Sequence, residues 1–197
     1  AGEIYTQVGQ TDYAAEIAQI RASGADSLFI FLPGGMGIAF MKQYAQSGVD
    51  IPVIGPGFSF SQDVLPAIGE AALGVHSSSS WAKDLDNEAS KTFVETFQAE
   101  YGRLPSIYAA QAYDTASLIV SAAAKASISD ADAFRAALKE ADFDSVRGKF
   151  SFNTNNHPIQ DIYVTEVIEE GGVLTNRIIG TVFTDHSDAY AEQCSLQ

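Results

Sequence analysis

The chain has 197 residues, of which 46% are hydrophobic and 18% charged, a balance that is typical of a folded globular protein and not of a disordered one. Its formal net charge is −14, with only 11 Lys and Arg, which argues against a nucleic-acid partner because phosphate binding needs clustered cations. No apolar run approaches the ~20 residues that span a bilayer.

The first part of the chain alternates between helix and strand signals. Thr11 is the expected N-cap of the first helix, and Gly24 is its expected end. Ser61 is expected to cap a short helix that runs toward Gly69. The first helix is thus expected over 12–23 and the next over 36–47, with strands over 27–32, 51–55 and 74–81. Helices and strands that alternate with short connections predict right-handed βαβ units and a parallel sheet.

The later part of the chain changes character twice. Helices are expected over 87–101, 106–126 and 130–141, with Asp86 or Asn87 capping the first and Asp130 opening the third. Strands are then expected over 146–152, 159–169 and 173–183, with a turn at Glu170-Gly171-Gly172. The predicted fold class is α/β, with a mainly parallel sheet, helices on both faces and a C-terminal antiparallel hairpin.

Two glycine-rich breaks follow the first two predicted strands. The strand over 27–32 runs into Pro33-Gly34-Gly35, and the strand over 51–55 runs into Gly55-Pro56-Gly57-Phe58. Continuous apolar runs of this length are typical of strands covered on both faces by helices. In open parallel sheets, ligands bind beyond the carboxyl ends of the strands. We therefore predict a ligand site at these two strand ends that is made largely of backbone.

Three aromatic residues stand near the predicted site. Phe58 and Phe60 lie in the loop after the second strand, and Tyr108 begins a helix after Pro105-Ser106. Core packing is the alternative for each, because aromatic side chains dominate protein cores. A site is favoured for Phe58, which follows Gly-Pro-Gly at the end of a strand, and Phe60 has the weaker claim.

The sequence carries no signature of catalysis, of a metal site or of a cofactor. His76, His157 and His186 lack metal-ligand spacing, and no nucleophile elbow, P-loop or dinucleotide fingerprint is present. Four acids match part of a calcium-loop template: Asp84, Asp86, Glu88 and Glu95. The template needs glycine where Ala89 stands, so helix capping explains these acids better.

Both ends of the chain bear on its context. The first residue is Ala1 rather than Met, and we expect a cut inside a longer protein, so the lack of a signal peptide says nothing about the compartment. Cys194 has no partner cysteine in the chain. It is either a free thiol or the partner of a cysteine in a missing segment.

Six segments together resemble the periplasmic solute-binding proteins of ABC importers, of the leucine/isoleucine/valine-binding type. In order, they are Thr11-Asp12-Tyr13, 17–26, Ile54-Gly55-Pro56-Gly57, 68–75, 112–116 and 146–152. The resemblance implies a type I fold of two α/β lobes, of which this chain would be the C-terminal half. It assigns residues 1–80 to the second lobe, 81–146 to a helical part of the incomplete first lobe, and 147–197 to a return to the second lobe. The helices over 87–141 would then lack the sheet that they normally cover and would expose apolar faces.

The resemblance also implies a function. Family members are periplasmic and close two lobes around a small molecule, which they deliver to a membrane permease without chemical change. By this resemblance the ligand-binding positions are Leu32, Pro33, Gly34, Gly35, Gly57, Phe58 and Tyr108. The expected partners are the small-molecule ligand, the permease and the missing N-terminal half.

The chain departs from the family pattern at one informative place. Members that bind branched-chain amino acids place an acidic residue after Gly-Pro, where it pairs with the ammonium group of the ligand, and here Gly57 and Phe58 stand instead. A buried ammonium group without an anion is costly, which favours an organic acid, aromatic acids included, over an amino acid. An amino-acid or amide ligand stays open, as does a ligand-sensing domain of a receptor or regulator, and an enzyme is the weakest alternative.

Overall fold

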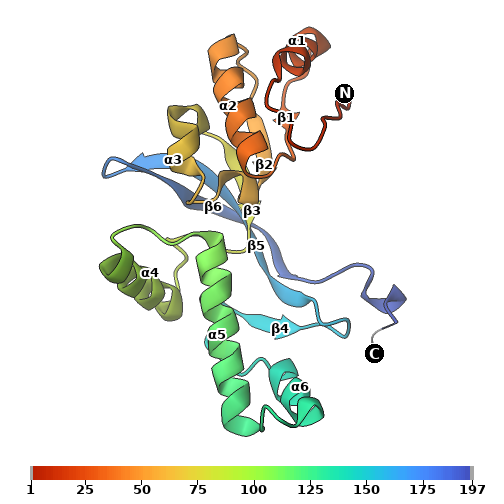
Figure 1. Ribbon diagram of the computed structural model, residues 1–197, viewed down its shortest axis with the longest axis vertical. Coiled ribbons are helices and arrows are strands. Elements are labelled where there is room, and N and C mark those ends of the chain that lie inside the picture. The colour runs from red at the N-terminus through yellow and green to blue at the C-terminus, as the bar shows by residue number, and fades with distance from the viewer. Residues whose placement is uncertain (1, 196–197) are drawn as a thin grey trace. The chain divides into compact units, whose positions relative to one another are not determined.

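The computed structural model describes residues 2–195 and divides the chain into two compact units (Figure 1). Unit 1 is the chain up to Ser79 together with Val164–Ile179. Unit 2 is Ser80–Tyr163 together with the chain from Gly180 onward. The segment 147–197 is therefore shared between the units, and each unit is described here by itself.

Unit 1 contains the βαβ elements predicted for the first part of the chain. Its helices are α1 (Ala14–Ser23), α2 (Gly35–Ser47) and α3 (Leu65–Ile68), its strands are β1 (Leu28–Phe29), β2 (Val53–Pro56) and β3 (His76–Ser79), and its short 3₁₀ turns are η1 (Gly57–Phe60) and η2 (Gly69–Ala72). β1 pairs in parallel with β2, with Leu28 opposite Val53, and β2 pairs in parallel with β3, with Ile54 opposite His76. The predicted parallel neighbours are thus confirmed, although β1 is shorter than the expected strand.

The expected cap of α1 is wrong. The N-cap position is Tyr13, and no side chain caps it, whereas the carboxylate of Asp12 accepts the N–H of Ala14 at 3.1 Å. Tyr13 is completely buried, and its N–H donates to the side chain of Gln43 on α2. A tertiary contact to α2 therefore takes the place of the Thr11 cap.

The expected cap of the short helix is also displaced. α3 begins after Val64, with no side-chain cap, and the Ser61 hydroxyl donates instead to the carboxylate of Asp63. The carbonyl oxygen of Ser61 accepts the N–H of Val64 at 2.9 Å, so Ser61 closes a turn before the helix rather than capping it.

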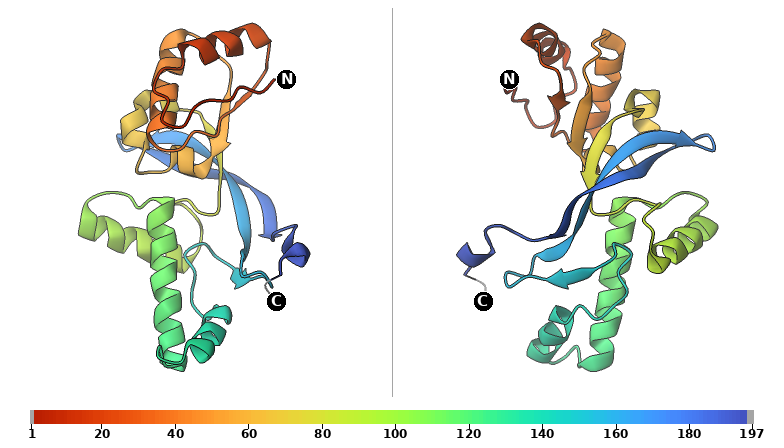
Figure 2. Two further views of the ribbon diagram at one scale, coloured as in Figure 1. Left: turned by 45° about the vertical axis from the view of Figure 1, so that its right-hand side comes forward. Right: turned by 180° about the vertical axis from the view of Figure 1, so that it is seen from behind.

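The prediction that both faces of these strands are covered is wrong for the described residues. The core of unit 1 joins helix residues to Ile30 and Val53, all on one face of the sheet. On the opposite face Phe29 is 66% exposed and Ile54 is 41% exposed. The right-hand view of Figure 2 shows β2 and β3 standing in front of α2 and α3 with no helix over them. Periodicity could not reveal this difference, because a continuous apolar run has no alternation.

The hairpin predicted at the end of the chain is present. Its strands are β5 (Pro158–Glu170) and β6 (Val173–His186), and the turn between them contains Gly171 and Gly172, both with positive φ. In unit 1, β5 pairs with β3, and the N–H of Val167 donates to the carbonyl of Val75 at 2.9 Å.

Unit 2 contains the three predicted helices, which are α4 (Glu88–Tyr101), α5 (Ile107–Lys125) and α6 (Ala131–Lys139). Asn87 caps α4 by accepting the N–H of Ser90 at 2.6 Å, and Asp130 caps α6 as predicted. None of the described helices is long and apolar enough to cross a membrane.

The strand expected over 146–152 is shorter in the structure. β4 (Phe150–Phe152) pairs antiparallel with β5, whereas the N–H of Val146 donates to the carboxylate of Asp114 on α5. Gly148 then turns the chain with a φ of 88°. A contact to a distant helix thus replaces the sheet pairing of this segment. The unit ends with the short 3₁₀ turn η3 (Ala191–Gln193).

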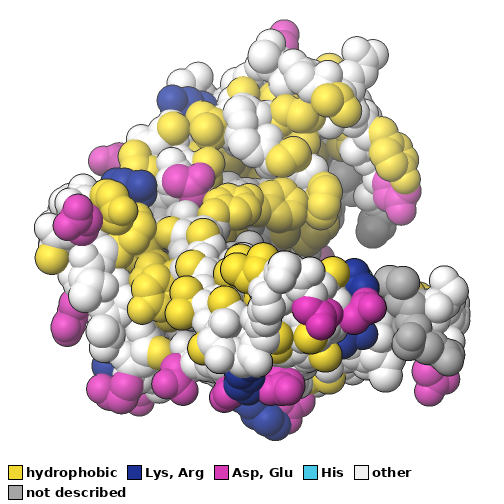
Figure 3. All heavy atoms as spheres, turned by 60° about the horizontal axis from the view of Figure 1, so that its bottom comes forward, with side chains coloured by type: hydrophobic (Ala, Val, Ile, Leu, Met, Phe, Trp, Pro, Cys, Tyr) yellow, Lys and Arg dark blue, Asp and Glu magenta, His cyan; other side chains and the backbone are white. Residues whose placement is uncertain are grey.

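The expected apolar exposure of the helical region is present. Six large hydrophobic side chains of this region are exposed: Tyr101, Tyr108, Tyr113, Ile119, Val120 and Ile128. On α5, Val120 is 70% exposed. Figure 3 shows hydrophobic side chains in contiguous groups on the surface. Large exposed apolar side chains of this number are consistent with the helices lacking a sheet to cover within the described residues.

Candidate functional site

The first predicted strand end is a tight turn from strand to helix. Leu32 is buried, whereas Pro33, Gly34 and Gly35 are exposed. Gly34 has φ 53° and ψ −126°, a conformation that only glycine adopts readily, and it occupies the N-cap position of α2. Its carbonyl accepts the N–H of Ile38 at 3.1 Å, which starts the helix. This turn brings the start of α2 to the end of β1.

The start of α2 offers backbone donors. The first N–H groups of a helix have no acceptor within the helix. Within residues 2–195, neither Gly34 nor Gly35 donates its N–H to a protein acceptor. No side chain caps this end either. The partial positive charge of a helix N-terminus favours an anion, so this turn can accept a carboxylate.

At the second predicted strand end, Gly57 is packed too closely against its neighbours to carry a side chain. Gly57 is buried, and a Cβ atom placed there would lie 2.8 Å from the carbonyl oxygen of Ser78 and 3.1 Å from the Cβ atom of Ser79. Both neighbours belong to β3. An acidic residue at position 57 would therefore require a shift of the backbone of η1 or of β3.

The two strand ends are joined by a hydrogen bond that the sequence analysis missed. The buried hydroxyl of Ser59 donates to the carbonyl oxygen of Leu32 at 3.0 Å. Beside it, the half-buried ring of Phe58 contacts the ring of Phe31 edge to face, with the centroids 5.1 Å apart. Both pairs span 27 residues of sequence, so no local pattern could indicate them.

Two residues near Phe58, one aromatic and one acidic, differ in their exposure. Phe60 has no exposed surface and belongs to the core of unit 1, so its alternative as a core residue is confirmed. Asp63 is exposed, and its carboxylate accepts the Ser61 hydroxyl.

Tyr108 belongs to unit 2. It lies in the first turn of α5, and 50% of its surface is exposed. The N-cap of this helix is Ser106, whose hydroxyl accepts the N–H of Ala109. Its participation in the ligand site stays a prediction.

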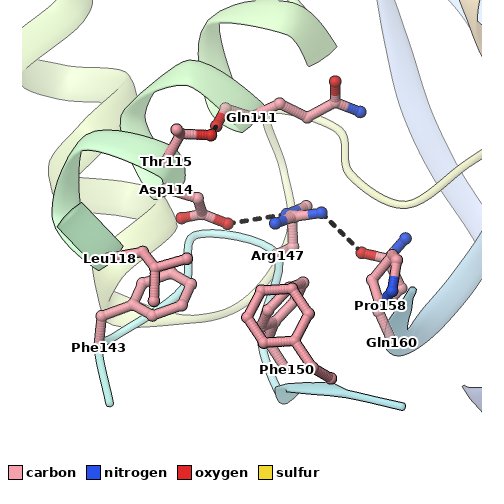
Figure 4. Close-up of a pocket in the computed structure, with 10 residues that line it drawn as sticks. Gln111, Asp114, Thr115, Leu118, Phe143, Arg147, Phe150, Pro158 and Gln160 are labelled. Carbon is pink, nitrogen blue, oxygen red and sulfur yellow. Dashed lines mark hydrogen bonds and ion pairs between the residues drawn. The ribbon is translucent and has the colours of Figure 1, made fainter. Parts of the chain in front are cut away.

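Unit 2 contains a pocket of about 350 Å³ that the sequence analysis did not predict (Figure 4). Aromatic and aliphatic side chains line one part of it, and a buried ion pair lines another. The lining residues are Gln111, Asp114, Thr115, Leu118, Phe143, Arg147, Phe150, Phe152, Pro158 and Gln160. They come from α5, β4, the start of β5 and the segment between α6 and β4.

The polar part of this pocket is internally satisfied. The buried carboxylate of Asp114 accepts from Arg147 Nε at 2.8 Å, and it also accepts the Ser145 hydroxyl at 2.6 Å. Figure 4 shows Arg147 between Asp114 and Gln160, whose side-chain oxygen accepts from the guanidinium at 2.9 Å. The guanidinium carbon of Arg147 lies over the ring of Phe150, 4.6 Å from the centroid of that ring. These contacts hold β4 and its preceding loop against α5.

The signal for this ion pair was present in the sequence in a weak form. Asp114 is the one acidic residue of α5, whose other residues are uncharged up to Lys125, and an acidic residue needs a partner if it is buried. Nothing local indicated that Arg147, 33 residues later, would be that partner.

In the described part of the chain, no group of three or more His, Cys, Asp or Glu residues could hold a metal ion. His76 is exposed on β3. The imidazole Nδ1 of His157 lies 3.6 Å from the carboxylate of Asp188. That carboxylate also accepts the backbone N–H of Tyr190, which is the main reason why the pKa of Asp188 is lowered. Cys194 is a free, half-buried thiol.

A sequence profile of the periplasmic binding protein family matches residues 1–172. Among curated proteins, a Leu/Ile/Val-binding protein homolog 6 from Brucella melitensis is 32% identical over 183 residues. The similarity covers 86% of this chain and 46% of that protein. The chain thus spans about half the length of the curated relatives it matches.

Solved structures with a similar fold include two solute-binding proteins of ABC transporters. One, from R. palustris in complex with benzoate, has a TM-score of 0.86 and 28% identity over 95% of this chain and 51% of its own. The other, from Rhodopseudomonas palustris HaA2 in complex with p-hydroxybenzoic acid, has a TM-score of 0.83 and 32% identity over 92% of this chain and 51% of its own.

Proposed function

This chain belongs to the periplasmic binding protein family, and we propose on that basis that it is part of an extracytoplasmic solute-binding component of an ABC importer. In this proposal the protein captures a small organic acid, with aromatic monocarboxylates as the preferred class, and delivers it to a membrane permease. The proposed ligand-binding residues are Leu32–Gly35, Gly57, Phe58 and Tyr108.

The observation that carries the ligand class is the close packing of Gly57 against β3. An amino-acid ligand needs an anionic partner for its ammonium group, because an unpaired buried charge is costly. The position after Gly55-Pro56 cannot hold an acidic side chain without a backbone shift, since a Cβ atom there would lie 2.8 Å from the Ser78 carbonyl oxygen. This packing supports a ligand without an ammonium group.

The other groups at the strand ends are suited to an acid with an aromatic ring. The N–H groups of Gly34 and Gly35 can receive a carboxylate at the start of α2. The half-buried ring of Phe58 offers an aromatic surface against which a second ring can stack. The benzoate and p-hydroxybenzoic acid complexes of the two related solute-binding proteins support the same ligand class.

A branched-chain amino acid is the second candidate ligand. It is supported by the name of the Brucella relatives, which are called Leu/Ile/Val-binding protein homologs. The two candidates make opposite demands on position 57, since only the amino acid requires a nearby carboxylate.

A further partner in the proposal is the remaining half of a full-length protein. The chain covers only 46% of the Brucella melitensis relative. The uncovered sheet face at Phe29 and Ile54 and the exposed α5 side chain Val120 are suited to burial against additional chain. Coexpression with the preceding segment is expected to protect these residues from hydrogen exchange and chemical labelling.

A ligand screen on the full-length protein tests the proposed function. We expect benzoate and 4-hydroxybenzoate to raise the melting temperature, because a ligand at ~100 times its dissociation constant adds ~2.7 kcal/mol to the folded state. Leucine, a dicarboxylate and an amide serve as comparison ligands. Tight leucine binding with no response to either aromatic acid contradicts the proposed ligand class.

A further inference from the structure

Two phenylalanines stand on the uncovered face of β1 and its extension, and only one of them touches the candidate site. Phe29 and Phe31 are two residues apart, so their side chains lie on the same face of the strand. They are 66% and 67% exposed. Phe31 contacts the ring of Phe58, with an interplanar angle of 84°, and Phe29 makes no ring contact among the described residues.

The backbone that carries Phe58 is fixed on both sides. Before it, Gly57 lies directly against β3. A Cβ atom placed on Gly57 would lie 2.8 Å from the carbonyl oxygen of Ser78. After it, the Ser59 hydroxyl donates to the carbonyl of Leu32 at 3.0 Å. The backbone at Phe58 is therefore fixed, and only the rotamer of the side chain is left to be determined.

Phe31 is placed to determine that rotamer. It directly precedes Leu32, so the ring contact and the Ser59 hydrogen bond join the same two segments at adjacent positions. In an edge-to-face pair, neighbouring rings are held nearly perpendicular by the attraction between a positive edge and a negative face. Such a contact covers at most one face of the Phe58 ring and leaves the other available.

We infer that Phe31 is a positioning residue that holds the Phe58 ring as a fixed wall of the ligand site and so gives the site its preference for planar aromatic acids over saturated ones. The inference rests on the proposed function, in which Phe58 contacts the ligand. A fixed ring favours a flat ligand because parallel stacking requires a defined plane, whereas a puckered aliphatic ring gains little from that plane. Phe31 itself does not touch the ligand.

Isothermal titration calorimetry on the full-length protein tests the role of Phe31 in binding. Benzoate is compared with cyclohexanecarboxylate, which has the same carboxylate and a saturated ring. Phe31→Leu is expected to weaken benzoate by about three- to tenfold and cyclohexanecarboxylate by much less, which is the size expected for one aromatic pair. Phe29→Leu is the matched control and is expected to change neither, and Phe31→Tyr is expected to retain the wild-type preference.

A second measurement, on the ligand-free protein, tests the contact itself. With phenylalanine rings labelled for NMR, Phe31→Leu is expected to move the ring resonances of Phe58, and Phe29→Leu is not. The inference is overturned if the Phe58 resonances do not respond to Phe31→Leu, or if Phe31→Leu and Phe29→Leu have equal effects on the ratio of the two affinities. A wild-type protein that binds leucine and neither acid contradicts the proposed function instead, while the resonances still report whether Phe31 positions Phe58.

Discussion

The hydroxyl of Ser59 donates to the backbone carbonyl of Leu32 at 3.0 Å, and this buried bond ties the ends of two parallel strands together. Each end contributes glycine-rich backbone to the candidate site. The bond thus connects the packing of unit 1 to the geometry of the proposed ligand contacts, because η1 cannot move away from the first strand end without breaking it.

We expect Ser59→Ala to destabilise the protein by about 1–2 kcal/mol, since the buried carbonyl of Leu32 loses its partner. Ligand binding is expected to weaken as well, because η1 is released. Thermal denaturation measures the first effect and calorimetry the second. Ser78→Ala, at an exposed position on β3, is the control and is expected to have little effect on the melting temperature. Equal stability of the two variants would contradict the importance of the bond.

Position 57 offers a direct test of the packing argument. Gly57→Ala is expected to lower the free energy of unfolding by about 1–3 kcal/mol, because the new methyl group would overlap the Ser78 carbonyl. Gly35→Ala is the matched control, since a Cβ atom at position 35 would meet nothing within 4 Å and Gly35 lies in the first turn of α2. This control is expected to be neutral or slightly stabilising. Urea denaturation of both variants provides the measurement, and a neutral Gly57→Ala would show that β3 yields at little cost.

Much of the fold could be predicted from the sequence because its signals are local. The helices α4 and α6 have their predicted caps, Asn87 and Asp130, since a cap and its helix are neighbours in sequence. The parallel pairing of β1 and β2 also followed from a local pattern, namely two apolar strands separated by one amphipathic helix.

The parts of the fold and of the site that could not be predicted depend on contacts between residues far apart in the sequence. The contact between Phe31 and Phe58 joins the extension of β1 to η1, and the ion pair between Asp114 and Arg147 joins a helix to a loop that had been expected to be a strand. Neither contact leaves a periodic trace in the sequence. Nor did the apolar run that ends at Leu32 show which face of the strand is uncovered, since its residues do not alternate between polar and apolar.

The carboxylate of Asp188 is expected to make stability depend on acid pH. Its pKa is lowered in the folded state, first by the backbone N–H of Tyr190 and also by the side chain of Asn155. A lowered pKa means that the folded state prefers the ionised carboxylate. The stabilisation is therefore fully present above the unfolded pKa of about 3.9 and is lost as the pH falls through the folded value.

The measurement is the stability of wild type and Asp188→Asn between pH 6 and pH 2. The wild type is expected to be the more stable protein at pH 6, and the two curves are expected to converge at the acid end. Glu192→Gln, a change in η3 near the same end of the chain, controls for the loss of one negative charge. Parallel curves for wild type and Asp188→Asn would contradict the role of this carboxylate.

The ion pair of Asp114 and Arg147 gives the largest expected effect on stability. Asp114 is 1% exposed, and its carboxylate accepts from Arg147, Ser145 and the N–H of Val146. Asp114→Ala is expected to cost about 3–5 kcal/mol, because it leaves a nearly buried guanidinium group without its anion. Asp114→Asn keeps the shape and one acceptor oxygen and is expected to cost less.

The control for this prediction is a surface ion pair in the same unit. Asp86 lies 2.7 Å from Lys91 and is highly exposed, and pairs of this kind contribute little because water screens them. Asp86→Asn is therefore expected to leave the denaturation midpoint unchanged. Chemical denaturation of the three variants beside wild type makes the comparison. If Asp114→Ala is no more destabilising than Asp86→Asn, the buried pair does not hold β4 and its loop against α5.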